Sequence, residues 1–255
     1  MRTVIVHYHI YKNSGTSFEQ VLDASFGDRH ERFDGPYPFF TIDQDRLDQI
    51  ITRRADAVAF SSHQTLLPVP TSLDYHVLAA TFLRHPILRL GSIYRFKRGA
   101  ADGTVTAQLA TRHDFAGWVE ASFEIRNELT HVSNPQTRYL AGVYGRHAIV
   151  REEHSQLRYD LATARRNLAQ VEMLGRTESF DADLRRFVGI AASHGLTLRI
   201  PEETRFNVTE EPAGSVEDRV EALLAQLPPA LRSRLLKANA QDLTLYADAT
   251  RLIEG

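Results

Sequence analysis

The feature that most restricts the fold is a change of pattern within residues 3–26. Residues 3–10 are rich in β-branched and aromatic side chains, which predicts a buried strand. Residues 12–17 read KNSGTS, a small and polar run that predicts a tight loop. Apolar residues then recur at the spacing of one helix face, and they are Phe18, Val21, Leu22 and Phe26. A strand, a tight loop and a helix therefore follow one another directly.

The rest of the chain alternates strands with helices. Further strands are predicted at residues 57–61, 75–83 and 170–174. The predicted helices are 43–54, one that begins at Pro86, most of 104–145, 157–169, 180–194, 215–226 and 228–253. This alternation favours an α/β, P-loop-like three-layer fold with a central, mostly parallel sheet and helices on both faces. No stretch reads as a linker, so we expect a single domain over residues 1–255, with a helix-rich insertion at about 104–165 that forms a lid or subdomain.

Composition excludes several classes of protein. Apolar residues make up 43% of the 255 residues, which is enough for a sizeable core. The chain has no cysteine, which excludes disulfides, thiolate zinc sites and cysteine nucleophiles and suits the cytoplasm. The formal net charge of −2 argues against a nucleic-acid partner. No apolar run is long enough for a membrane span, so we expect a cytoplasmic protein.

The loop at residues 12–17 has the chemistry of an anion site. Backbone N–H groups at a helix start, together with the helix dipole, favour a bound phosphate. Gly15 allows close approach, and Lys12 adds positive charge. Because Lys12 precedes the glycine, the loop does not match the G-x-x-x-x-G-K-[ST] motif of ATP-binding P-loops. Glu19, three residues after Thr16, predicts a capping box. A capped helix beside a solvated lysine is the alternative.

The stretch HIYKNSGTS at residues 9–17 resembles the loop HIPKTGGTS of the 3′-phosphoadenosine 5′-phosphosulfate (PAPS)-dependent sulfotransferases. The likeness is to their carbohydrate, heparan-type branch and its bacterial relatives. It departs from that pattern at Tyr11, which replaces a proline. It also departs at Asn13 and Ser14, which replace smaller residues. The resemblance implies that the loop holds the 5′-phosphosulfate of the co-substrate through Lys12, Asn13, Ser14, Gly15, Thr16 and Ser17.

The stretch TFLRHPILRLGSIY at residues 81–94 resembles a second signature of that family, FLRDPVERLLSHY. The resemblance implies that Arg84 and Ser92 bind the 3′-phosphate of PAPS. An arginine at the carboxyl end of a parallel strand is well placed for this, since its planar fork suits phosphate. His85 replaces the usual aspartate. The alternatives are a structural ion pair for Arg84 and an ordinary helix position for Ser92.

Weaker likenesses extend the match to about residue 185. Residues 173–180, MLGRTESF, are similar to a strand-to-helix segment of the branch, and residues 134–142, NPQTRYLAG, to a stretch of bacterial members. Beyond these, residues 207–209 follow a predicted strand and either line the nucleotide pocket or form a surface turn.

The family resemblance implies transfer of a sulfuryl group from PAPS to an acceptor hydroxyl, with no metal. Lys12 would stabilise the leaving phosphate. His63 follows the strand at 57–61 and resembles the histidine that serves as general base in the branch. A polar turn histidine is the alternative, and Glu178 is a weaker base candidate.

The acceptor is predicted only as a small molecule or glycan, and the sequence does not define an oligomeric state. Arg95, Arg98 and Arg138 either hold an anionic acceptor or lie on a solvated helix face. Two rival functions stay open: a P-loop phosphotransferase that uses ATP, and a non-catalytic nucleotide-binding protein.

Overall fold

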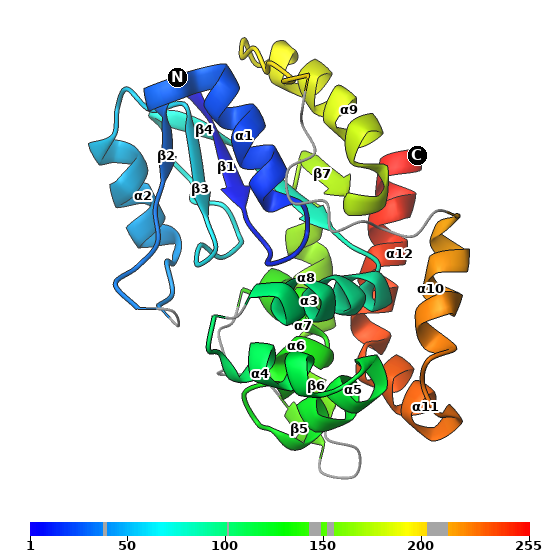
Figure 1. The fold of residues 1–255 in the computed structure, drawn as a ribbon. Helices are drawn as coiled ribbons and strands as arrows, with labels where there is room; N and C mark the ends of the chain where they lie inside the picture. The colour runs from blue at the N-terminus through cyan, green and yellow to red at the C-terminus, as the bar shows by residue number, and fades with distance from the viewer. Residues whose placement is uncertain (38–39, 101, 143–148, 152–155, 203–213) are drawn as a thin grey trace.

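A five-stranded parallel sheet forms the centre of the computed structural model (Figure 1). The structure describes residues 1–255 except 38–39, 101, 143–148, 152–155 and 203–213. The strands lie in the order β2-β3-β1-β4-β7. Their bounds are Arg2–Tyr8 for β1, His30–Arg32 for β2, Ala59–Ser62 for β3, Tyr75–Leu83 for β4 and Met173–Arg176 for β7. The carboxyl ends of these strands therefore share one edge of the sheet.

Helices cover both faces of the sheet, which confirms the predicted three-layer fold. Ile5 of β1 faces a cluster formed with α1 (Gly15–Phe26) and α9 (Phe180–Ser193). Its neighbours in the strand face the opposite cluster. The helices of that second face are α2 (Gln44–Arg53), α3 (Pro86–Ala100), α8 (Leu161–Leu168) and α12 (Ala240–Glu254). No helix in the described part of the chain is both long and apolar enough to cross a membrane.

Several predicted boundaries change in the structure. Gly175 lies inside β7 instead of ending it. The strand β2 was not predicted, because three residues carry too little periodicity to detect. The predicted helix 228–253 divides into α11 (Pro229–Ala238) and α12, since the side chain of Asn239 donates hydrogen bonds to the carbonyls of Val132 and Leu235 between them.

The helix-rich stretch lies beside α3, at the end of the molecule toward which the strands point (Figure 1). Trp118 is fully buried in it, against Tyr94 and Phe115. The elements are α4 (Val105–Arg112), α5 (Phe115–Glu124), α6 (Leu129–Val132), α7 (Pro135–Leu140), the antiparallel pair β5 (Ile149–Arg151) and β6 (Gln156–Arg158), and then α8. Another helix, α10 (Val216–Leu224), starts with a capping box.

A carboxylate from α12 fixes the start of α7. Asp242 is fully buried and accepts hydrogen bonds from the backbone N–H of Gln136 at 3.0 Å and of Thr137 at 2.6 Å. The hydroxyl of Thr137 donates to the same carboxylate at 2.7 Å. These are the donors that an α-helix leaves without an internal acceptor in its first turn. Asp242 therefore joins the C-terminal helix to the helix-rich stretch.

We expect Asp242→Asn to lower the free energy of unfolding by about 1–3 kcal/mol, because the new amide NH₂ would face N–H and O–H donors in a buried site. Urea denaturation measures this loss. Glu254→Gln is the matched control on the same helix, because it removes only an exposed partner of Arg176 and should change the stability by under about 1 kcal/mol. Equal effects of the two substitutions would contradict the role given to Asp242.

Candidate active site

The loop between β1 and α1 contains two non-glycine residues in the left-handed backbone region. Lys12 has a φ of 64° and Ser14 a φ of 60°. Such conformations cost about 1–3 kcal/mol each and persist where the surroundings fix them. The buried side chain of Asn13 does so, since its Nδ2 donates to the carbonyl of Phe82 at 2.9 Å and to Oε1 of Gln136 at 2.7 Å. The side chain of Asn13 thus shapes the loop and turns inward.

The helix α1 starts with no side-chain cap. Its N-cap is Ser14, which makes no cap hydrogen bond through its side chain. The predicted capping box between Thr16 and Glu19 is wrong, because the carboxylate of Glu19 turns away and pairs with His9 at 2.9 Å. The first turn of α1 and its dipole therefore present N–H groups and positive potential to the end of β1. This is the arrangement that favours a bound anion.

Glycine is the only residue type that fits at position 15, where α1 starts. A Cβ atom there would lie 2.0 Å from Cδ2 and Nε2 of His9. The ring of His9 cannot easily turn aside, because it packs against the rings of His7 and His63, with centroid distances of 5.0 and 3.7 Å, and is hydrogen-bonded to Glu19. The imidazole of His9 therefore packs directly on the loop backbone.

Lys12 projects toward α3. Its ammonium Nζ lies 4.1 Å from the ring centroid of Phe96, a cation–π contact. Burial, and then the positive charges of Arg84, Arg95 and Arg89, lower the pKa of Lys12 to about 8. Because burial and nearby cations disfavour the charged form of Lys12, a bound anion stabilises its ammonium group more than that of an exposed lysine.

Arg84 follows β4 and contacts the loop itself. Its side chain is buried, and Nη1 donates to the carbonyl oxygen of Lys12 at 3.2 Å. Nε lies 4.0 Å from Oε1 of Glu178. Burial lowers the pKa of Arg84 to about 10, while the charge of Glu178 acts in the opposite direction. The two sequence motifs, about 70 residues apart, thus meet at one point.

Gln136, for which the sequence predicted no role, and Glu178, predicted as a weaker base candidate, hold Arg84 in place. Oε1 of Gln136 accepts from the backbone N–H of Arg84 at 3.0 Å, and Nε2 of Gln136 donates to its carbonyl at 2.9 Å. The carboxylate of Glu178 accepts from the N–H of His85 at 3.0 Å and from the hydroxyl of Tyr246 at 2.9 Å. Because both of its oxygens accept hydrogen bonds, Glu178 is better suited to orient Arg84 than to abstract a proton. The only sequence signal for Gln136 was its place in the family-like stretch 134–142.

His63 lies at the same sheet edge, directly after β3. Its Nδ1 is 3.0 Å from the carbonyl oxygen of His9, so this nitrogen carries the proton and Nε2 is left as the basic atom. Its backbone N–H donates to Asp34 at 3.0 Å. Partial burial, and then the nearby His9, lower the pKa of His63, which keeps the ring neutral at physiological pH. A neutral imidazole with a fixed tautomer can accept a proton.

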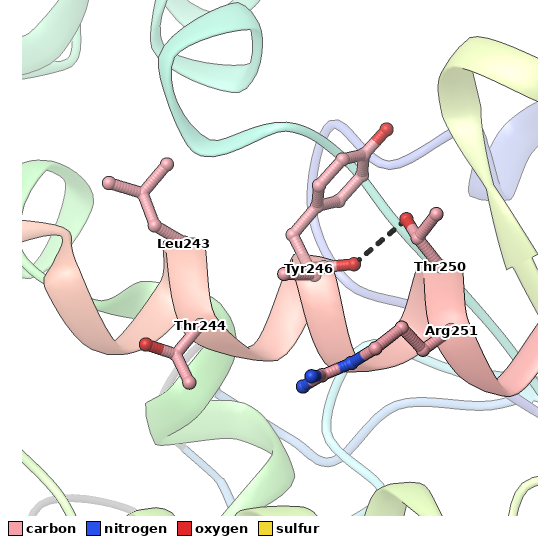
Figure 2. A pocket seen from close by; sticks show the side chains of 6 residues that line it. Leu243, Thr244, Tyr246, Thr250 and Arg251 are labelled. Atoms are coloured by element: carbon pink, nitrogen blue, oxygen red, sulfur yellow. Dashed lines mark hydrogen bonds between the residues drawn. The ribbon is translucent and has the colours of Figure 1, made fainter.

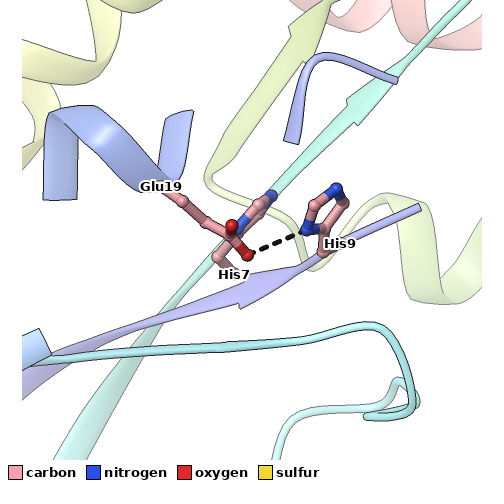
Figure 3. Close-up of side chains that lie close together, drawn as sticks. All are labelled: His7, His9 and Glu19. Carbon is pink, nitrogen blue, oxygen red and sulfur yellow. Dashed lines mark hydrogen bonds and ion pairs between the residues drawn. The ribbon is translucent and has the colours of Figure 1, made fainter. Parts of the chain in front are cut away.

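Glu19, from α1, meets His7 and His9 at the end of β1 (Figure 3). Ligand atoms of the three lie within 4.8 Å of one another, as in a metal site. Here, however, Nδ1 of His9 is 2.9 Å from Oε1 of Glu19, a hydrogen-bond distance shorter than the roughly 3.3 Å edge of a tetrahedral zinc site. Nδ1 of His7 is engaged with Oγ of Ser61 at 3.2 Å. The group forms a hydrogen-bonded histidine network beside the loop.

Of the other residues predicted to bind the nucleotide or the acceptor, Ser92 and Arg95 lie in α3, the helix after Arg84, whereas Arg98 and Arg138 make contacts or take positions elsewhere. Ser92 is buried in α3, two turns beyond the start of that helix, and Arg95 raises the positive potential at both Lys12 and Arg84. Arg98 instead donates to the hydroxyl of Tyr94 at 2.6 Å. Arg138 lies on α7. Residues 207–209, predicted near the nucleotide, lie outside the described residues.

A hollow on the surface of α12 is separate from this group. It is lined by Leu243, Thr244, Tyr246, Ala247, Thr250 and Arg251 (Figure 2). Neither Lys12 nor Arg84 borders it, and its link to the loop runs through the hydroxyl of Tyr246 and Glu178. The residues of the two sequence motifs and His63 therefore gather at the sheet edge and not in this hollow.

Comparison with known proteins decides the family. A family model described as "Sulfotransferase family" matches residues 1–247, nearly the whole chain. The chain belongs to the sulfotransferase family. Sulfotransferases of this family generally use PAPS as the sulfuryl donor, and both motifs described above lie within the matched range.

The chain is also similar in sequence to one uncharacterised protein along nearly its whole length. The chain is 25% identical over 251 residues to an uncharacterised protein of Archaeoglobus fulgidus, and the alignment covers 96% of this chain and 95% of the relative. The likeness therefore spans the sheet, the helix-rich stretch and the C-terminal helices together.

We expect Gly15→Ala to destabilise the sulfotransferase by about 1–3 kcal/mol, because the added methyl group overlaps the His9 ring. Urea denaturation measures the effect. Gly189→Ala, at an exposed position of α9 with open space around it, is the matched control and should be neutral or stabilising. In a His9→Ala background the cost of Gly15→Ala should shrink, and an unchanged cost would contradict the steric explanation.

We expect an anion to bind with uptake of a proton near pH 8 to 9, because it raises the pKa of Lys12 from about 8. Affinity for adenosine 3′,5′-bisphosphate should accordingly fall as the pH rises above about 8, where free Lys12 loses its charge. Calorimetry in two buffers of different ionisation enthalpy measures the proton uptake. Lys12→Met should abolish it, whereas Lys237→Met, at an exposed site on α11, should not.

Proposed function

We propose that this sulfotransferase transfers the sulfuryl group of PAPS to a hydroxyl of a carbohydrate or other small molecule. The observation that carries the proposal is the hydrogen bond from Arg84 to the carbonyl of Lys12. It brings the cations of both motifs to one edge of the sheet, where α/β proteins bind ligands. A nucleotide with phosphates at both its 5′ and 3′ positions matches two such cations.

In the proposed complex, the backbone of the loop holds the 5′-phosphosulfate. The N–H groups at residues 14–17 and the hydroxyl of Thr16 face this anion, while the side chain of Asn13 keeps the loop in shape. Arg84 and Ser92 take the 3′-phosphate. The strained loop supports this assignment, because backbone strain of this kind collects at ligand sites.

The transfer step follows from the positions of Lys12 and His63. The acceptor oxygen attacks sulfur, the bond from sulfur to the bridging oxygen breaks, and its electron pair stays on the departing 5′-phosphate. Lys12 stabilises that negative charge. Nε2 of His63 takes the acceptor proton, because Nδ1 is engaged with the carbonyl of His9. The charges and atoms balance without a metal.

The positive charge of Arg95 is the basis for what we propose about the acceptor. Arg95, at the exposed end of α3, adds positive potential beside Lys12 and suits an acceptor that carries a carboxylate or sulfate. Arg98 would contribute less, since it donates to the hydroxyl of Tyr94, and Arg138 lies on another helix, α7. A cytoplasmic location belongs to the same proposal, because a chain without cysteine suits a reducing compartment.

Donor identity is tested by thermal unfolding with a nucleotide panel. Adenosine 3′,5′-bisphosphate should raise the Tm clearly more than ATP or ADP with Mg²⁺, because only the former presents a 3′-phosphate. A larger shift with ATP would favour a phosphotransferase and contradict the proposal. Arg84→Met should remove the preference for the 3′-phosphate.

Catalysis is tested with labelled PAPS and a panel of sugars, phenols and glycolipids. Once an acceptor is found, Lys12→Met and His63→Asn should each lower kcat at least about 100-fold. His63→Asn should leave bisphosphate affinity nearly unchanged. Lys237→Met and His113→Asn, at exposed sites, are the controls. Full activity of His63→Asn would exclude His63 as the base.

A further inference from the structure

We propose that His76, Glu172 and His194 form a Zn²⁺ site at the opposite end of the sheet from the proposed donor site. His76 is near the start of β4, Glu172 directly precedes β7, and His194 caps the C-terminal end of α9. Three elements far apart in sequence thus bring two imidazoles and a carboxylate together. At the rise of a strand, His76 lies roughly 26 Å from Arg84 along β4.

Each imidazole lies near one oxygen of the Glu172 carboxylate, at a distance close to the ligand spacing around a zinc ion. Nε2 of His76 is 3.3 Å from Oε1 of Glu172, and Nε2 of His194 is 3.5 Å from Oε2. Bonds of about 2.0–2.1 Å to a tetrahedral Zn²⁺ require ligand atoms about 3.3 Å apart. The three ligand atoms also lie within 4.8 Å of one another. Both histidines point the same nitrogen, Nε2, at the carboxylate.

A ligand nitrogen in this cluster lacks a hydrogen bond. Nε2 of His76 is buried and has no hydrogen-bond partner among the described residues, although Glu172 is close. Burying a polar atom without a partner is unfavourable, and a bound ion would satisfy it. This distinguishes the cluster from the one at His9, where the equivalent contact is a hydrogen bond of 2.9 Å.

The surroundings favour a cation that has access from solvent. The side chains of His76, Glu172 and His194 are each about one-third exposed, which leaves a path and room for a water ligand. His194 lies at the C-terminal end of α9, where the helix dipole is negative. The two rings are nearly parallel, 5.1 Å apart, so both must turn about χ2 to aim at one ion, and that torsion has a broad energy minimum.

The ligand set selects the class of metal. Two neutral imidazoles and one carboxylate suit Zn²⁺, whereas Mg²⁺ and Ca²⁺ prefer oxygen ligands alone. A bound ion would connect the end of α9 to β4 and to β7, the strand at the edge of the sheet. Its role would therefore be structural, and the proposal does not depend on the sulfotransferase reaction.

The test uses the full-length protein after removal of metals with a chelator. Calorimetry with Zn²⁺ should show a single saturable site, and Zn²⁺ should raise the Tm by several degrees, reversed by EDTA. His194→Asn and Glu172→Gln should each weaken binding by roughly tenfold or more, while bisphosphate binding stays unchanged. Co²⁺ should give the visible absorption of a tetrahedral site, lost in His76→Asn.

Two controls keep the test decisive. His113→Asn, at an exposed site on the helix-rich stretch, should leave Zn²⁺ affinity unchanged. His9→Asn should also leave Zn²⁺ affinity unchanged if the ion binds at His76, Glu172 and His194. Absence of saturable binding, or binding lost in His9→Asn and kept in His194→Asn, would overturn the proposal.

Discussion

A single buried amide, that of Gln136, joins the parts of the molecule on which the proposed chemistry depends. Its oxygen accepts hydrogen bonds from Asn13 and from the backbone of Arg84, and its nitrogen donates to the carbonyl of Arg84. The amide comes from α7, whose own start is held by Asp242 of α12. The loop after β1, the end of β4 and the helices α7 and α12 are thereby held in one arrangement, because connected hydrogen bonds in a buried site rigidify the segments that they join.

This arrangement concentrates positive charge at a buried edge of the sheet. Arg84 and Arg89 both have pKa values lowered to about 10, mainly by burial. Arg89 is held by the carbonyl of Tyr11, and its Nη1 has no hydrogen-bond partner among the described residues. Taking a charge out of water reduces stability to the extent that its partners do not compensate for the lost hydration. An anion bound at this edge would relieve that cost, so affinity for a phosphorylated ligand and stability of the fold are coupled here.

Sequence patterns predicted the sheet and its layers because the strands carry long apolar runs. The strand at residues 75–83 was predicted with its observed bounds, since it is buried almost throughout. The match of motifs to a family likewise located Lys12, His63 and Arg84 at one sheet edge. The inward turn of Asn13, the pairing of Glu19 with His9 and the position of Gln136 could not be predicted. Each depends on contacts between residues far apart in sequence, which no local periodicity records.

The burial of Trp118 has a practical consequence for the study of this chain. It is the only tryptophan in the sequence, and it lies in the helix-rich stretch, away from the strands. Fluorescence excited selectively at tryptophan therefore reports on that stretch and its contact with Tyr94 of α3, while circular dichroism averages over the whole molecule. If the two signals follow different denaturation curves, the helix-rich stretch and the rest of the molecule unfold in separate steps. If the curves coincide, the molecule behaves as one cooperative unit.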